Sequence, residues 1–263
     1  MILDKIDPTT RILALIVLTT PLLLSIDVVS ASVALAATVV LAPLCGVGPM
    51  RLLRRGWPLL ALAPLTGISM LLYGRAGGEE YFSFLLIKVT ENSVSLSIAV
   101  MVRVLAVGLP AVVLTADMDP TRLGDGLAQL WRLPARFVIG AVAGVRLATL
   151  FRQDWQALDR ARRARGLADE NKVKRFPKQM FALLVLALRR GSKLATAMEA
   201  RGFGAETGPD GQPVQRTWAR PARFGWWDVA MLLVCALVSA LALGIAVYTG
   251  DFRLLGVVGS NAN

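Results

Sequence analysis

Histidine is absent from this chain of 263 residues, and cysteine occurs only at Cys45 and Cys235. Most zinc sites and histidine-based acid–base mechanisms are thereby excluded, because they depend on an imidazole group. The two cysteines lie far apart, each within an apolar run, so a disulfide framework is also excluded. These absences disfavour most hydrolases, and we expect neither catalytic residues nor a metal site.

Two further properties of the composition conflict in an average soluble protein. Hydrophobic residues make up 55% of the chain, yet 29 Lys and Arg residues stand against 18 Asp and Glu, for a net charge of +11. A globular domain seldom combines so apolar a composition with so strong a charge. We therefore expect the apolar residues and the charge to lie in different segments.

Five apolar runs reach, or nearly reach, the length that crosses a bilayer as a helix, about 17–25 residues. They cover residues 11–26, 28–45, 57–73, 93–116 and 226–249. Tryptophan and tyrosine lie at several run ends, as is typical of membrane interfaces. The first two runs meet at Asp27, which we expect to be the polar turn of a tight hairpin. The sequence predicts an all-α, polytopic membrane protein with about five transmembrane helices.

Most of the charge lies between the fourth and fifth runs, where residues 117–225 contain 20 Lys and Arg against 10 Asp and Glu. By the positive-inside rule, this insertion and the N-terminus are cytoplasmic. Three parts follow: a four-span membrane domain at 1–116, a cytoplasmic domain at 117–225, and a last span with a tail at 226–263.

The insertion is predicted to contain three helices, at about 120–131, 134–165 and 178–201. Each of the two long helices ends in Ala-Arg-Gly and then an apolar residue. The two segments are Ala164-Arg165-Gly166-Leu167 and Ala200-Arg201-Gly202-Phe203. A glycine just past a helix adopts the left-handed conformation readily, and the apolar residue after it packs back on the last turn.

A helical spacing of three and four residues places each arginine at the end of a stripe of apolar and small residues. Small residues at mid-helix, Gly144, Ala148, Ala187 and Gly191, would let the two helices cross closely. We expect a crossed pair with equivalent tips at Arg165 and Arg201. Helix capping alone would explain a single tip; two tips in phase suit a partner with two similar sockets, which a rigid guanidinium can enter as a pin.

The segments 187–192 and 197–203, together with Ala164-Arg165-Gly166, resemble the T component (EcfT/CbiQ type) of energy-coupling factor ABC transporters. The N-terminal segment Asp7-Pro8-Thr9-Thr10-Arg11 is similar to a motif of the same family, although Thr9 stands where the family favours arginine. The resemblance extends over nearly the whole chain and is most specific in the two Ala-Arg-Gly segments.

The resemblance implies a non-enzymatic coupling subunit in the cell membrane of a prokaryote. Such a subunit links a membrane-embedded, substrate-binding S component to two cytoplasmic ATPases for uptake of vitamins or metal ions. ATP would be bound by the ATPases, and no cofactor is expected here; the chain has no Gly-x-x-x-x-Gly-Lys-Ser/Thr phosphate loop. The ATPase-docking residues implied are Ala164, Arg165, Gly166, Ala200, Arg201 and Gly202.

An apolar face of the insertion is the expected resting place of the S component. Its residues are Phe137, Phe151, Trp155, Phe181 and Leu184. Burial against the cytoplasmic ends of the spans is an equal alternative for each of them. A further candidate, Arg103, lies within the fourth run, where a charge facing lipid is costly. It either supports the bundle where a partner docks, or extends to the membrane surface or pairs with a backbone carbonyl.

An ABC importer permease with its own substrate pathway is the alternative function. Such permeases usually couple through one short loop, so the large insertion with two matched tips disfavours that reading. The lipid bilayer is an expected partner. Nucleic acid is not, because stacking aromatic residues do not alternate with the basic ones.

Overall fold

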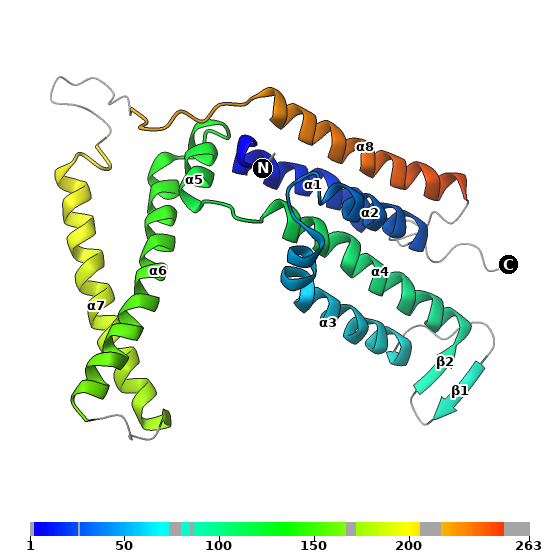
Figure 1. Ribbon diagram of the computed structural model, residues 1–263, viewed down its shortest axis with the longest axis horizontal. Coiled ribbons are helices and arrows are strands. Elements are labelled where there is room, and N and C mark those ends of the chain that lie inside the picture. Colours follow the sequence, from blue (N-terminus) through cyan, green and yellow to red (C-terminus); the bar gives the residue numbers. More distant parts are fainter. Residues whose placement is uncertain are drawn as a thin grey trace. The chain divides into compact units, whose positions relative to one another are not determined.

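The computed structural model describes residues 3–25, 27–73, 80–84, 87–166, 172–205 and 217–249. The described chain is helical apart from one two-stranded hairpin, and it divides into two compact units (Figure 1). Unit 1 extends to Asp119 and resumes at Arg223, and unit 2 is Pro120–Ala222. Both connections between the units are therefore single stretches of chain.

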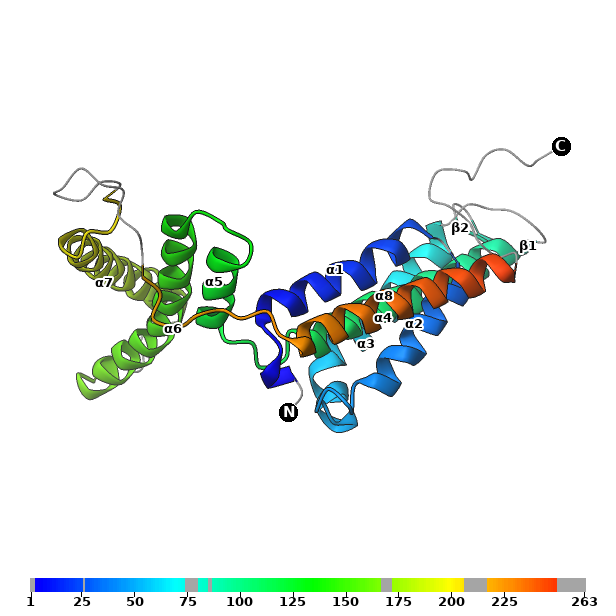
Figure 2. The same cartoon turned by 90° about the horizontal axis from the view of Figure 1, so that it is seen from above.

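Unit 1 turns each of the five apolar runs into a helix. Its elements are η1 (Leu3–Lys5), α1 (Pro8–Leu24), α2 (Val28–Leu41), α3 (Pro49–Tyr73), β1 (Glu80–Phe84), β2 (Ile87–Thr90), α4 (Glu91–Leu114) and α8 (Trp226–Tyr248). Figure 2 shows the helices of this unit running side by side, with α8 against α1 and α2, and α4 against α2 and α3. The antiparallel β1–β2 hairpin precedes α4 and was not predicted.

Three of these helices, α3, α4 and α8, are long and apolar enough to cross a membrane. The apolar helices α1 and α2 are shorter. The predicted class, a polytopic helical membrane protein, is confirmed.

The turn between α1 and α2 has the predicted polar residue. Asp27 is the N-cap of α2, where its Oδ2 accepts the Ser30 N–H at 2.6 Å. Asp7 plays the same part for α1, since its Oδ1 accepts the Thr9 N–H at 2.9 Å. A carboxylate at this position satisfies a backbone donor that the helix itself leaves without a partner.

Helix α3 begins eight residues before the predicted run. Its first turns include Arg51, Arg54 and Arg55, which lie outside that run. Pro49 at the first position suits a helix start because its fixed φ is helical. An N–H group at this position would have no partner within the helix, so its absence loses no hydrogen bond. Arg55 donates a hydrogen bond of 2.7 Å to Asp117, which lies just past α4. This hydrogen bond, together with the positive charge of Arg55, lowers the pKa of Asp117 from its usual value.

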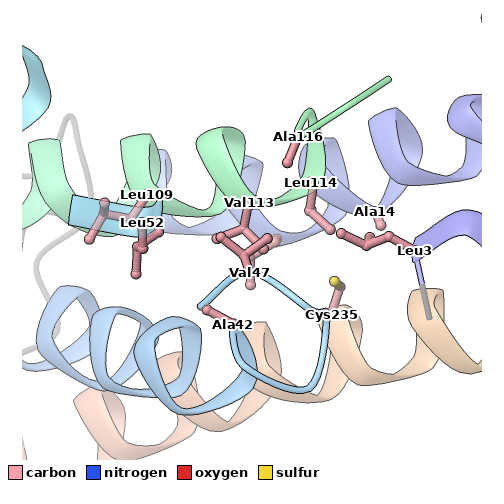
Figure 3. Packing of buried hydrophobic residues seen from close by; sticks show 11 residues of the cluster. Leu3, Ala14, Ala42, Val47, Leu52, Leu109, Val113, Leu114, Ala116 and Cys235 are labelled. Atoms are coloured by element: carbon pink, nitrogen blue, oxygen red, sulfur yellow. The ribbon is translucent and has the colours of Figure 1, made fainter. Parts of the chain in front are cut away.

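The core of unit 1 is formed by buried apolar side chains from all five helices and the adjoining turns. Figure 3 shows Val47 and Val113 facing one another at its centre, with Leu52 and Leu109 at one end and Leu3 and Leu114 toward the other. Small residues, Ala14 in α1 and Ala242 in α8 among them, are completely buried, so the helix backbones approach closely.

Unit 2 contains the three predicted helices, α5 (Pro120–Gln129), α6 (Ala135–Ala164) and α7 (Lys172–Ala200). The two long ones, α6 and α7, cross as predicted (Figures 1 and 2). Helix α7 begins six residues before its expected start and includes Pro177. Pro177 is the sixth residue of this helix, beyond its first turn, so its missing N–H removes one intrahelical hydrogen bond.

The predicted crossing through small residues is wrong. A Cβ added at Gly144 or Gly191 would have no neighbour within 4 Å, so neither glycine lies in a close contact. The tight approach is instead between α5 and α6, where a Cβ on Gly124 would lie 2.3 Å from Val142 Cγ2. The first half of α6 thus packs against α5 through Val138 and Val142. The predicted stripe of apolar and small residues therefore does not form the contact face along the whole helix.

Candidate partner-docking site

The two Ala-Arg-Gly segments end their helices in the same way. Gly166 and Gly202 have φ of 74° and 76°, in the left-handed region that favours glycine. At the end of α7, the Gly202 N–H bonds Glu199 O at 2.9 Å and the Phe203 N–H bonds Met198 O at 2.9 Å, which is a complete Schellman motif. At the end of α6, the Gly166 N–H makes the matching bond to Arg163 O at 3.0 Å.

Arg165 and Arg201 are both solvent-exposed. Arg165 is the C-cap of α6, and Arg201 is the first residue after α7. Each arginine thus lies between the last helical residue and a left-handed glycine, which fixes the direction of the backbone from which the side chain extends. The four neighbours Ala164, Gly166, Ala200 and Gly202 are exposed as well.

We expect the last turns of α6 and α7 to be stabilised by the left-handed glycine that follows them, rather than by the helix propensity of their residues. Gly202→Ala should destabilise the end of α7 by about 1 kcal/mol, because a Cβ disfavours positive φ. Exchange of the Phe203 amide hydrogen should accelerate roughly fivefold as its bond to Met198 opens more often. Gly191→Ala is the control: it adds the same methyl group within α7, in open space, and should stabilise the helix. Equal exchange of Phe203 in both variants would contradict the role of Gly202.

A pair of interhelical ion pairs holds α6 to α7, and we call it the clasp. Arg190 of α7 donates to both carboxylate oxygens of Asp154 of α6, at 2.5 and 2.9 Å. Arg175 of α7 pairs with Asp159 of α6, which also accepts a bond from Arg163 at 2.7 Å. Asp159 thus has a partner on its own helix as well as on α7, whereas Asp154 pairs across the two helices.

An aromatic contact lies beside the clasp. The ring centroids of Trp155 in α6 and Phe176 in α7 are 6.0 Å apart and tilted by 54°, an arrangement typical of attractive aromatic pairs. Trp155 and Phe151 are half-buried here. Two of the five residues expected to contact an S component therefore lie partly within the unit.

The other three lie on its surface. The exposed fractions of Phe137, Phe181 and Leu184 are 67%, 69% and 54%. Further exposed apolar residues of α7 extend the set at helical spacing and were not predicted: Met180, Val185 and Leu188. An apolar helix face of this kind on a protein surface is typical of an interaction site.

A groove of about 520 Å³ lies among α5, α6 and the end of α7. Its lining includes Val142 and Leu147 of α6, Leu194 and Met198 of α7, and Trp218. Leu194 and Met198 belong to the predicted stripe that ends at Arg201. The face of α7 that leads to this tip therefore borders an apolar groove.

Arg103 pairs with a backbone carbonyl, one of its expected roles. Its guanidinium donates to Leu22 O at 3.0 Å. Leu22 lies in the last turn of α1, where carbonyl groups lack intrahelical donors and the helix dipole is negative. Arg103 thus connects α4 to the end of α1.

These elements define a multi-pass helical membrane protein with a separate unit of three helices, two of them crossed and ending in matched arginines. The family model described as CbiQ, cobalt transport protein, matches residues 1–210. The chain belongs to this family, and the predicted T-component resemblance is confirmed.

Curated relatives agree with this assignment. The chain is 29% identical over 199 residues to the energy-coupling factor transporter transmembrane protein EcfT of Limosilactobacillus fermentum, covering 70% of each chain. It is 25% identical over 214 residues to the protein of the same name from Streptococcus equi, covering 77% of this chain and 79% of the relative. A third such protein, from Exiguobacterium sibiricum, is 26% identical over 217 residues, or 78% of each chain.

Proposed function

We propose that this chain is the transmembrane energy-coupling subunit of an energy-coupling factor importer. It joins two cytoplasmic ATPases to a membrane-embedded S component that binds a vitamin or a metal ion. The family and the names of the relatives support the coupling role. The chain itself is not an enzyme and holds no cofactor, since ATP is bound by the ATPases.

The observation that carries this proposal is the pair of exposed arginine tips. Arg165 and Arg201 end two crossed helices, and each precedes a glycine in the left-handed conformation. A fixed guanidinium offers five donors in a planar fork, which suits a cleft lined by carboxylates or carbonyl groups. Two ATPases present two similar clefts, one for each tip.

The clasp gives the two tips a common motion. ATP binding draws the ATPases together, and their clefts then pull on both tips at once. Because Asp154–Arg190 and Asp159–Arg175 join α6 to α7, the helices respond as a pair rather than separately. The apolar face of α7, with Phe181 and Leu184, transmits this motion to the S component and tilts it.

The proposed orientation follows from charge. Unit 2 lies in the cytoplasm with the N-terminus, at the inner face of a prokaryotic cell membrane, because the basic residues are concentrated in this part of the chain.

Native mass spectrometry of the complex tests this function. A tagged copy of the chain, purified from its own membrane in mild detergent, should be recovered with two ATP-binding subunits and one small membrane protein. Recovery of this chain alone, or with an extracellular binding protein in place of the S component, would instead favour a permease with its own substrate pathway.

A further inference from the structure

Three charged residues that play no part in the tips are buried together in unit 1. Asp7, Arg11 and Asp228 have exposed fractions of 9%, 3% and 1%. They lie at the beginning of α1 and of α8. Arg11 and Asp228, together with the backbone groups that they bind, form what we call the anchor cluster. Burial of charged groups is unfavourable unless each group is hydrogen-bonded, so their partners decide what they do.

Each carboxylate oxygen of Asp228 accepts a hydrogen bond from a backbone N–H, and the two donors lie at the starts of different helices. Its Oδ1 accepts the Asp7 N–H at 2.8 Å, and its Oδ2 accepts the Gly225 N–H at 2.8 Å. The first bond joins the start of α8 to the start of α1, 221 positions away in the sequence. The second caps α8 at the residue where the chain returns from unit 2. A carboxylate also suits these two positive helix ends.

Arg11 makes the corresponding connection to α4. Its guanidinium donates to the carbonyl groups of Leu3 and Ile6 before α1, and to Ala116 O, just past α4, at 3.4 Å. Ala116 lies three residues before Asp119, where unit 1 ends and the chain enters unit 2. Lys5 adds a contact beside the cluster, with its Nζ 5.3 Å from the centre of the Trp227 ring in α8.

Both connections between the two units are thus fastened to the start of α1. The departing chain is bound at Ala116 through Arg11, and the returning chain is bound at Gly225 through Asp228. Each bond is made to a backbone group, so it holds the path of the chain itself. Apolar packing would hold the helices together but would not fix these two points.

We propose that Asp228 and Arg11 are positioning residues that transmit movement of unit 2 to the membrane helices. This inference rests on the proposed coupling function. A force on either connection reaches α1, α4 and α8 through the anchor cluster. Without the cluster, the ATPases still bind unit 2, but its movement is taken up in the two connections.

Asp228→Asn tests the proposal with little change in size. The side-chain amide of asparagine has one acceptor oxygen, so it can accept a hydrogen bond from the Asp7 N–H or from the Gly225 N–H. Its NH₂ group then faces the other backbone N–H, and that hydrogen bond is lost. Asp7→Asn is a matched control: its bond to Asp228 comes from the backbone, and asparagine is as good an N-cap as aspartate. Asp117→Asn is a second control, since it removes only an exposed ion pair with Arg55.

The measurement is hydrogen–deuterium exchange of the purified complex, with and without ATP plus vanadate. In the wild type and both controls, nucleotide should change exchange in α6 and α7 and in the cytoplasmic ends of α4 and α8. In Asp228→Asn the change should persist in α6 and α7 but be lost in α8. Arg11→Met removes the donors to Ala116. In this variant the nucleotide-dependent change in exchange should be lost in α4 and should persist in α8.

Nucleotide-dependent exchange in α4 and α8 that matches the wild type in both variants would overturn the proposal. A role in stability alone would alter exchange equally with and without nucleotide, which would also overturn it. Failure of the ATPases to co-purify with the wild-type chain is a different result, because it contradicts the coupling function itself.

Discussion

Replacement of Arg165 and Arg201 together by glutamate is expected to abolish the association of the ATPases with this chain. Each substitution turns a cation that enters a cleft into an anion. Loss of one partner from a desolvated charge pair at an interface weakens binding by about 2–5 kcal/mol. Two such losses exceed what the remaining contacts supply. The measurement is the amount of ATPase recovered with the tagged chain from the membrane.

The single variants should show that the tips act together. With one tip intact, the ATPases lose the advantage of two-point attachment, which is worth about 10²–10⁴-fold in affinity. Arg165→Glu and Arg201→Glu alone should therefore each weaken association strongly without abolishing it. A matched double variant, Arg152→Glu with Arg189→Glu, changes exposed arginines of the same two helices away from their ends. Equal loss in that control would indicate a general effect of charge rather than docking.

Reversal of one charge in the clasp is expected to lower ATPase recovery, although less than replacement of both arginine tips. Asp154→Arg places a guanidinium against Arg190 and removes two charge-assisted hydrogen bonds, each worth about 1.5–3 kcal/mol. The pair is half-buried, so the repulsion is only partly screened by water. We expect α6 and α7 to separate at this point, and the two tips then no longer match the spacing of their clefts. ATPase recovery should fall, although both arginine tips are present.

The charge-swapped double variant separates the clasp from a general loss of stability. Asp154→Arg with Arg190→Asp restores an ion pair between the same two helices in the opposite sense. Recovery of the ATPases should return toward the wild-type level, together with the distance between spin labels placed on the exposed faces of α6 and α7. Failure of the double variant to recover either property would contradict the clasp as the element that sets the crossing.

Much of this fold is predictable because its signals are local. A bilayer requires long apolar runs, so the five helices of unit 1 could be located to within a few residues except at the start of α3. The helix ends in unit 2 are equally local: Gly166 and Gly202 each follow the arginine that comes after the last helical residue, and their left-handed backbone was expected from residue type alone.

The contacts between helices were less predictable because they depend on rotation as well as on pattern. Spacing in α6 predicted one stripe through Gly144, whereas the first half packs through Val138 and Val142 because Gly124 lets α5 approach. The partner of Asp154 could not be found along its own helix, since Arg190 is 36 residues away.

Two buried charges in unit 1 are indicated in part by the sequence. Arg11 and Asp228 are both charged residues at the edge of an apolar run, where burial requires a polar partner. That signal indicates that a partner exists, but only the fold identifies it as a backbone group at the end of another helix, Ala116 for Arg11 and Asp7 for Asp228.

If the two matched helix ends enter two ATPase subunits, the residues beside the arginines must lie within reach of those subunits. Site-specific photo-cross-linking measures this, with a photoreactive residue placed at Ala164 or at Ala200 so that both arginines remain. Each position should give an adduct with an ATPase subunit. Gln156 and Ser192, which are exposed positions nearer the starts of the same two helices, should give none. Adducts from Gln156 and Ser192 without any from Ala164 and Ala200 would show that the ATPases dock on the sides of α6 and α7 and not at their ends.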